Sequence, residues 1–126
     1  MRRNRRQSGP EDRLRAEHML YLCRECIAEF ASVDEETFRA RRVFQTSLAW
    51  YLQAIGEAAS RVSDEARAKL PAVPWKQIVG TRHILSHEYD RLMPDKLWRI
   101  LRSHLPSLLA ALEKGIDSLP NDNERG

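Results

Sequence analysis

The chain has 126 residues, 42% of them hydrophobic and 31% charged, which suits one soluble domain with a single core and is too short for two. No apolar run approaches the roughly 20 residues that a membrane-spanning helix needs, and no apolar segment follows the basic N-terminus as it would in a secretory signal. We therefore expect a cytoplasmic protein.

The basic residues are mainly arginines, with 17 Arg against 4 Lys. Because a guanidinium binds phosphate through two parallel hydrogen bonds, this bias is compatible with a nucleic-acid partner. A GC-rich genome, which favours arginine codons, would produce the same bias. The formal net charge of +3 does not decide between the two explanations.

Apolar residues recur with helical spacing along nearly the whole chain, and no segment is a convincing strand. Long helices joined by short loops predict an all-α fold, an antiparallel bundle of four to five helices. We expect residues 1–9 to form a disordered basic arm, residues 10–119 the helical domain and residues 120–126 a frayed tail.

The first helix is predicted to begin near Pro10, with Ser8 as its N-cap. Glu11 and Asp12 would lie in its first turn, where the helix dipole favours acidic residues. Its apolar stripe comprises Ala16, Met19, Leu20, Cys23, Cys26, Ile27 and Phe30.

The two cysteines of the chain, Cys23 and Cys26, form a C-x-x-C pair on this stripe. Such a pair can hold zinc or carry out redox chemistry, and His18 lies close enough along the helix to be a third ligand. However, no second pair completes a zinc site, and a free cysteine on an apolar stripe behaves as a small hydrophobic residue. We therefore expect both thiols to be packed in the core.

The second helix is predicted to run from Asp34, a suitable N-cap, to about Val62. Gly56 lies inside it, where a glycine lowers helix stability by roughly 1 kcal/mol relative to alanine. A glycine in this position indicates that another helix approaches closely. The apolar stripe of the second helix includes Phe38, Leu48, Leu52, Ile55, Ala59 and Val62.

Prolines mark most of the remaining elements. A short helix is predicted at residues 63–70, and Pro74 then opens a helix at residues 75–89, where its missing N–H is no loss. Pro94 opens the last long helix. Pro106 should kink that helix, because a proline removes a backbone donor and its ring clashes with the preceding turn.

The helix at residues 75–89 has polar residues where its apolar stripe should continue. Arg82 and Tyr89 occupy the stripe and are seven residues apart, so they lie on nearly the same line. A buried arginine is costly unless it is paired. Two interpretations stay open: Arg82 forms a buried salt bridge, with Glu57 as a candidate partner, or it lines a cleft that accepts phosphate.

The neighbouring line of this helix is also polar, with Lys76, Gly80, His83 and His87. Such a line makes a poor core face and a suitable wall for an anionic ligand. Arg82 and His87 are five residues apart, about 140° around an ideal helix, which is too wide for one tight site. We expect either that the helix ends near His87 or that a second chain completes the site.

Three stretches of the sequence resemble one known family. Residues 82–89 have the form R-x-x-x-x-H-x-Y and resemble the signature of the HepT toxins, a branch of the HEPN superfamily. Residues 55–59 resemble the family's G-E-A segment, and residues 74–80 resemble its P-W-x-x-I-x-G run. The arginine–histidine spacing alone occurs by chance, but the combination is fairly specific. The resemblance covers about residues 14–118.

The resemblance implies a HEPN-type bundle that dimerises, places two such motifs across one cleft and cleaves RNA without a metal or other cofactor. It also implies a partner, a minimal nucleotidyltransferase antitoxin of the MntA kind, which silences the toxin by transferring AMP from ATP to the motif tyrosine. In this sequence the catalytic pair would be Arg82 and His87, and the modified residue Tyr89. His83 and Glu57 would be supporting residues.

One position departs from the family pattern, which usually has asparagine directly after the arginine where this chain has His83. A histidine can still donate or accept a hydrogen bond, and it adds a second titratable group. It could take over the role of the asparagine, shift the pH optimum or weaken the enzyme.

The motif chemistry fits cleavage of RNA by its own 2′-OH. A histidine, with an unperturbed pKa of about 6.5, can act as base or acid at neutral pH, and Arg82 would stabilise charge on the phosphoryl oxygens. Because the nucleophile comes from the substrate, no metal-bound water is required, and DNA lacks the reacting group. Two alternatives stay open: an inactive HEPN module that binds nucleotide and regulates a nucleotidyltransferase partner, and a plain structural bundle.

Overall fold

The computed structural model describes residues 10–87 and 93–120, and all regular structure in these residues is helical. Long helices form the framework, and short ones connect or end them, so the predicted all-α bundle is confirmed. The elements are α1 (Pro10–Glu29), α2 (Glu35–Ala40), α3 (Arg42–Ser60), α4 (Asp64–Lys69), α5 (Trp75–His87), α6 (Pro94–Arg99), η3 (Ile100–His104), α7 (Leu105–Gly115) and η4 (Ile116–Ser118).

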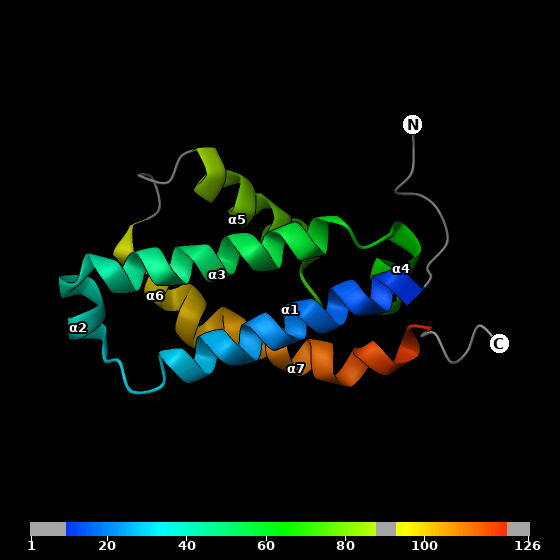
Figure 1. Ribbon diagram of the computed structural model, residues 1–126, viewed down its shortest axis with the longest axis horizontal. Helices are drawn as coiled ribbons and strands as arrows, with labels where there is room; N and C mark the ends of the chain where they lie inside the picture. Colours follow the sequence, from blue (N-terminus) through cyan, green and yellow to red (C-terminus); the bar gives the residue numbers. More distant parts are fainter. Residues whose placement is uncertain (1–9, 88–92, 121–126) are drawn as a thin grey trace.

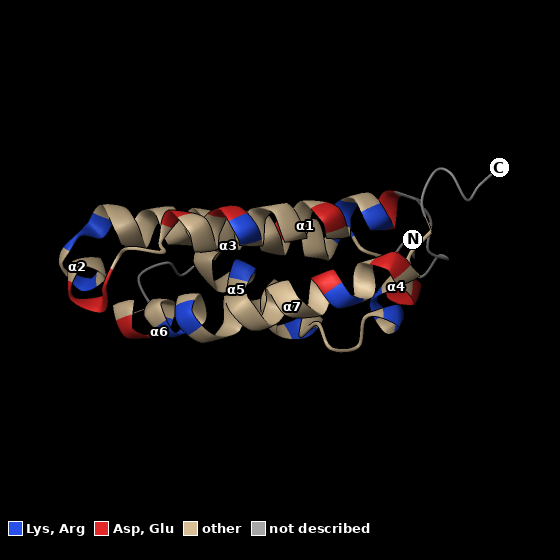
Figure 2. Ribbon diagram, turned by 90° about the horizontal axis from the view of Figure 1, so that it is seen from below, with Lys and Arg blue, Asp and Glu red and all other residues tan. Residues whose placement is uncertain are grey.

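The long helices form two layers. In Figure 1, α1 and α3 lie side by side and run in opposite directions, and α5 packs along α3. Figure 2 shows α1 and α3 as one layer, with α5 and α7 in the layer beneath it. The outer face of the α1–α3 layer remains open to solvent, since Leu14, Tyr21 and Trp50 on it are all more than half exposed.

Some predictions fall on parts of the chain that the structure does not describe. The basic arm with its Ser8 cap, residues 121–126 of the tail, and Tyr89 all lie outside the described residues. Among the described helices, none combines the length and the apolar character that crossing a membrane requires.

The core lies between the two layers and is built from the predicted apolar stripes. Cys23 and Cys26 are fully buried, and this burial raises the pKa of both thiols to about 12. The prediction that they pack as small hydrophobic residues is confirmed. No three His, Cys, Asp or Glu side chains in the described part of the chain are grouped as a metal site would need. The largest fully buried side chains include Phe30, Phe38, Met19, Leu48, Ile55, Leu70, Leu97, Leu112 and Leu119.

The prediction that the second helix is continuous is wrong, because the chain breaks at Arg41. This residue is extended, with φ −121° and ψ 112°, and separates α2 from α3. The break turns α2 so that Phe38 is buried, with its ring 6.1 Å from that of Phe30 and 5.3 Å from that of Trp98. The side-chain amide of Gln45 donates to the Phe38 carbonyl at 3.0 Å and so satisfies an acceptor near the end of α2.

The N-cap predicted at Asp34 is confirmed, and Ser63 caps the short helix that was predicted to begin there. Asp34 accepts a hydrogen bond from the N–H of Thr37 at 2.8 Å, and Ser63 accepts one from the N–H of Ala66 at 3.2 Å. Asp12, predicted only as an acid in the first turn, is buried and accepts from both the N–H and the hydroxyl of Ser63, at 2.8 and 2.7 Å. The start of α1 is thereby tied to the start of α4.

The disturbance predicted at Pro106 is a widened turn rather than a simple kink. The N–H of Leu105 donates to the carbonyl of Ile100, five residues back, within the π-helical turn η3. In a regular helix the ring of Pro106 would clash with the carbonyl of Arg102, which also loses its donor. Widening the turn relieves this clash while the chain stays helical.

Candidate active site

The candidate site begins where α5 crosses α3 and Gly56 meets Arg82. A Cβ atom added at Gly56 would lie 2.4 Å from the Cβ of Arg82, closer than real Cβ atoms come to other atoms. The close helix approach predicted from this glycine is therefore confirmed. The Cβ of Arg82 itself lies in the crossing. The packing of α5 on α3 therefore fixes the position from which the arginine side chain extends.

Arg82 forms an ion pair with Glu57, the residue next to the glycine. Nη2 of Arg82 lies 2.6 Å from Oε1 of Glu57, and the two side chains are 36% and 44% exposed. The predicted partner is thus present, but the pair is open to solvent and not buried. Exposed ion pairs stabilise a fold by about 0–1 kcal/mol, so an anionic ligand can displace the carboxylate at little cost. Glu57 also binds Arg61 at 3.1 Å and would keep a partner after such a displacement.

The two histidines lie together on the outer side of α5. His83 and His87 are exposed, and their ring centroids are 4.6 Å apart. This orientation follows from the opposite side of the helix, where Trp75 and Leu85 are buried and the Trp75 indole donates to the Leu70 carbonyl at 3.1 Å. The polar line predicted from the sequence therefore faces solvent.

Arg82 and His87 keep the angular separation that the sequence indicated. α5 is helical from Trp75 to His87, so a step of five residues still turns through about 140°. The structure thus brings Arg82 to Glu57 and His87 to His83, on different sides of one helix. Within one chain, the side chains of Arg82 and His87 therefore point in two different directions.

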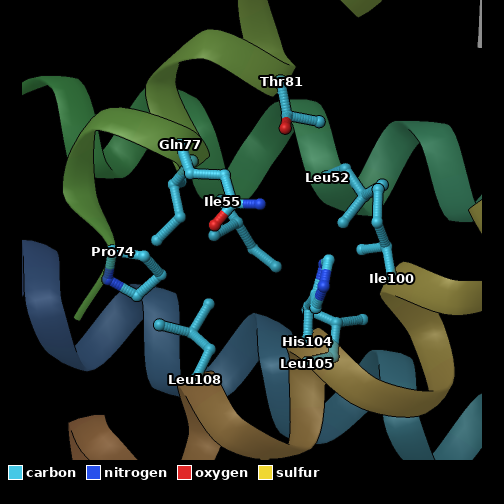
Figure 3. A pocket seen from close by; sticks show the side chains of 10 residues that line it. Leu52, Ile55, Pro74, Gln77, Thr81, Ile100, His104, Leu105 and Leu108 are labelled. Carbon is cyan, nitrogen blue, oxygen red and sulfur yellow. The ribbon is translucent and has the colours of Figure 1, made fainter. Parts of the chain in front are cut away.

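A pocket on a different flank of α5 was not predicted. It has a volume of about 50 Å³ and lies between α5 on one side and η3 and α7 on the other (Figure 3). Gln77, Thr81 and His104 contribute its polar groups, and Leu52 and Ile55 of α3 are among its apolar lining residues. His104 was not predicted as a site residue because it lies on the polar side of the last helix. The one indication in the sequence was Pro106, because His104 lies in the widened turn that this proline causes.

Comparison with known proteins identifies the family that carries this site. A family model described as "Ribonuclease HepT-like" matches residues 19–115. The chain belongs to the HepT-like ribonuclease family. The match spans most of this HepT-like chain and includes every residue of the candidate site from Gly56 to His87.

Relatives of this HepT-like protein carry ribonuclease names. "Putative RNase MJ1380" of Methanocaldococcus jannaschii is 32% identical over 88 residues, which cover 69% of this chain and 81% of that protein. "Putative RNase TTE0752" of Caldanaerobacter subterraneus subsp. tengcongensis is 33% identical over 92 residues, 73% of this chain and 82% of that protein. "Probable ribonuclease HepT" of Thermococcus cleftensis is 29% identical over 91 residues, 71% and 83% of the two chains. No solved structure matches the chain.

Proposed function

We propose that this HepT-like chain is a metal-independent endoribonuclease and the toxin of a HepT/MntA-type (type VII) toxin–antitoxin pair. The observation that carries the proposal is the position and pairing of the Arg82 side chain. This side chain begins at a helix crossing, and its guanidinium is partly open to solvent and paired with an exposed carboxylate that a phosphate can replace. Membership of a ribonuclease family makes an RNA phosphate the natural ligand.

The proposed reaction uses the 2′-OH of the substrate as nucleophile. A base removes its proton, the oxygen attacks the neighbouring phosphorus, and the bond to the 5′ oxygen breaks as that oxygen takes up a proton. His87 acts in these proton transfers, and Arg82 stabilises the charge on the phosphoryl oxygens. His83, whose ring centroid lies 4.6 Å from that of His87, offers a second titratable group beside it.

The active form is proposed to be a homodimer in which residues 80–90 of the two copies face each other. The motivation is the direction of the motif groups, because Arg82 and His87 point to different sides of α5. The outward line of α5 is exposed at His83 and His87, and Ile84 beside it is 37% exposed. Each protomer then needs to supply only part of one cleft.

The reaction is tested with two RNA oligonucleotides that differ at one scissile position. The all-ribose strand should be cut at the same rate with and without EDTA, whereas a strand with a 2′-deoxy sugar at that position should not be cut there, because its nucleophile is missing. Products are separated on a sequencing gel. Cleavage after the deoxy sugar, or loss of all activity in EDTA, would contradict the mechanism.

Regulation is proposed to act through Tyr89, which follows His87 by two residues and lies outside the described part of the chain. A partner nucleotidyltransferase of the MntA kind would transfer AMP from ATP to its hydroxyl and release pyrophosphate. The phosphodiester adds negative charge and bulk next to the motif. Its phosphate can then pair with Arg82 or His87, the groups that the RNA phosphate needs.

Co-expression with a neighbouring transferase tests this switch. We expect mass spectrometry to find AMP on the peptide that contains Tyr89, and the modified protein to have lost RNA cleavage. Tyr89→Phe should remove the adduct and leave the toxin active in the presence of the transferase. A Tyr89→Phe protein that is still silenced by covalent modification at another residue would contradict the assignment.

A further inference from the structure

A second basic site lies on the outer face of the α1–α3 layer, away from the histidines of α5. The two helices, side by side in Figure 1, border a groove of about 400 Å³. Its shape follows from small residues, because Ala54 and Ala58 of α3 form part of its lining. Its charged groups are Arg15 of α1, Glu57 of α3 and Arg61, the C-cap of α3.

Arg15 lacks a partner in this groove. Its Nε is buried and has no hydrogen-bond acceptor, and its guanidinium forms no ion pair with any residue in the described ranges 10–87 and 93–120. Buried donors of charged groups are almost always satisfied, since an unpaired one is unfavourable. The unsatisfied Nε of Arg15 therefore indicates a missing acceptor beside the groove. Its planar fork of donors matches a phosphate group.

The groove keeps an excess of positive charge in spite of its carboxylate. Glu57 binds Arg61 at 3.1 Å and Arg82 at 2.6 Å, so one negative charge is shared by two arginines while Arg15 adds a third positive charge. Glu57 lines the groove and contacts Arg82, so this one carboxylate links the groove to the arginine of the motif. A ligand with one phosphate at Arg82 and another in the groove would neutralise positive charge at both places.

Exposed aromatic rings accompany this charge. Tyr21 of α1 is 57% exposed and stacks against His18, which lines the groove, with ring centroids 6.5 Å apart and an interplanar angle of 11°. Trp50, 60% exposed, lies seven residues before Glu57 and so on the same line of α3. Positive grooves flanked by exposed aromatic rings suit single-stranded RNA, whose bases stack on such rings while its phosphates bind arginine.

We propose that the α1–α3 groove binds a second phosphate of the RNA strand that Arg82 holds at the cleavage site, with Arg15 as its main ligand and Arg61 as the second. This inference rests on the proposed ribonuclease function. It assigns Arg15 and Arg61 to binding and not to the chemical step. An RNA strand long enough to reach the groove gains affinity from these two arginines, whereas a dinucleotide with a single phosphate does not.

The test measures binding of the full chain to a short single-stranded RNA whose 2′-hydroxyls are methylated, so that it cannot be cut. Arg15→Gln and Arg61→Gln should each weaken binding by about tenfold at low salt, because each removes a charge-assisted phosphate contact. The slope of log K against log salt should fall by about 0.7 for each. Arg42→Gln is the matched control: Arg42 is exposed, begins the helix that Arg61 caps and lies outside the groove, so its loss should leave the slope unchanged.

The outcomes separate this inference from the function on which it rests. Both groove variants should elute at the molecular mass of the unaltered chain. If the unaltered chain binds and cuts RNA while both variants bind it equally well, the groove assignment is wrong and the ribonuclease function stands. If the variants instead change the molecular mass, the groove is an interface between copies and the assignment is also wrong. If the unaltered chain neither binds nor cuts RNA, the groove assignment falls with the proposed function.

Discussion

Replacing His87 by alanine is expected to abolish RNA cleavage while leaving the stability of the fold unchanged. His87 is exposed on the outer line of α5, so its truncation opens no cavity. The loss of a group that transfers protons typically lowers the rate by about 10²–10⁴-fold. The measurements are the initial rate of cleavage and the thermal unfolding midpoint. His104→Ala serves as the control, because His104 is also exposed but lies in η3, by the pocket on a different flank of α5.

The same experiment has a second arm that tests whether two protomers share the site. Arg82→Ala should also inactivate the protein, by analogy with other preorganised donors, whose removal costs about 10²–10³-fold in rate. When the Arg82→Ala and His87→Ala chains are co-expressed, a mixed dimer combines the intact arginine of one with the intact histidine of the other. Part of the activity should then return. A failure to recover activity would argue against the shared site, and a His87→Ala protein that cuts RNA at the normal rate would show that His87 is not the catalytic histidine.

The local signals of the sequence predicted much of the fold because they act over a few residues. The predictions of the cap at Asp34, of a short helix beginning at Ser63 and of the buried cysteines were correct, since each depends on one helical turn or one apolar stripe. The break at Arg41 was missed for the same reason. Apolar residues continue with helical spacing across it, and neither glycine nor proline marks it; the burial of Phe38 against other helices decides it.

The candidate site shows the same division between local and distant information. The motif on α5 and the glycine of α3 were visible in the sequence, but their contact joins residues 56 and 82 and depends on how two helices pack. The α1–α3 groove could not be predicted at all. Arg15 and Arg61 are 46 positions apart, and each looks like an ordinary solvated arginine until the helices are laid side by side.

Gly56→Ala should show the largest combined loss of stability and activity of any single methyl group added to this chain. The new Cβ would lie 2.4 Å from the Cβ of Arg82, and neither atom can rotate away, because each is attached directly to its backbone. α3 and α5 must therefore move apart. Overpacking of this kind lowers stability by about 1–3 kcal/mol, which exceeds the roughly 1 kcal/mol that alanine gains over glycine in a helix. The displaced guanidinium should lower the cleavage rate by about 10²-fold.

Thermal unfolding and cleavage of the same preparations measure the two effects. Gly80→Ala is the matched control for stability, because a Cβ there meets no atom within 4 Å and should only gain helix propensity. Combining Gly56→Ala with Arg82→Gly removes one of the two clashing carbons. If the clash is the cause, Gly56→Ala must be less destabilising in the Arg82→Gly background than in the unaltered chain. Equal destabilisation in both backgrounds, or an alanine variant with normal stability and cleavage, would show that the glycine crossing does not position Arg82.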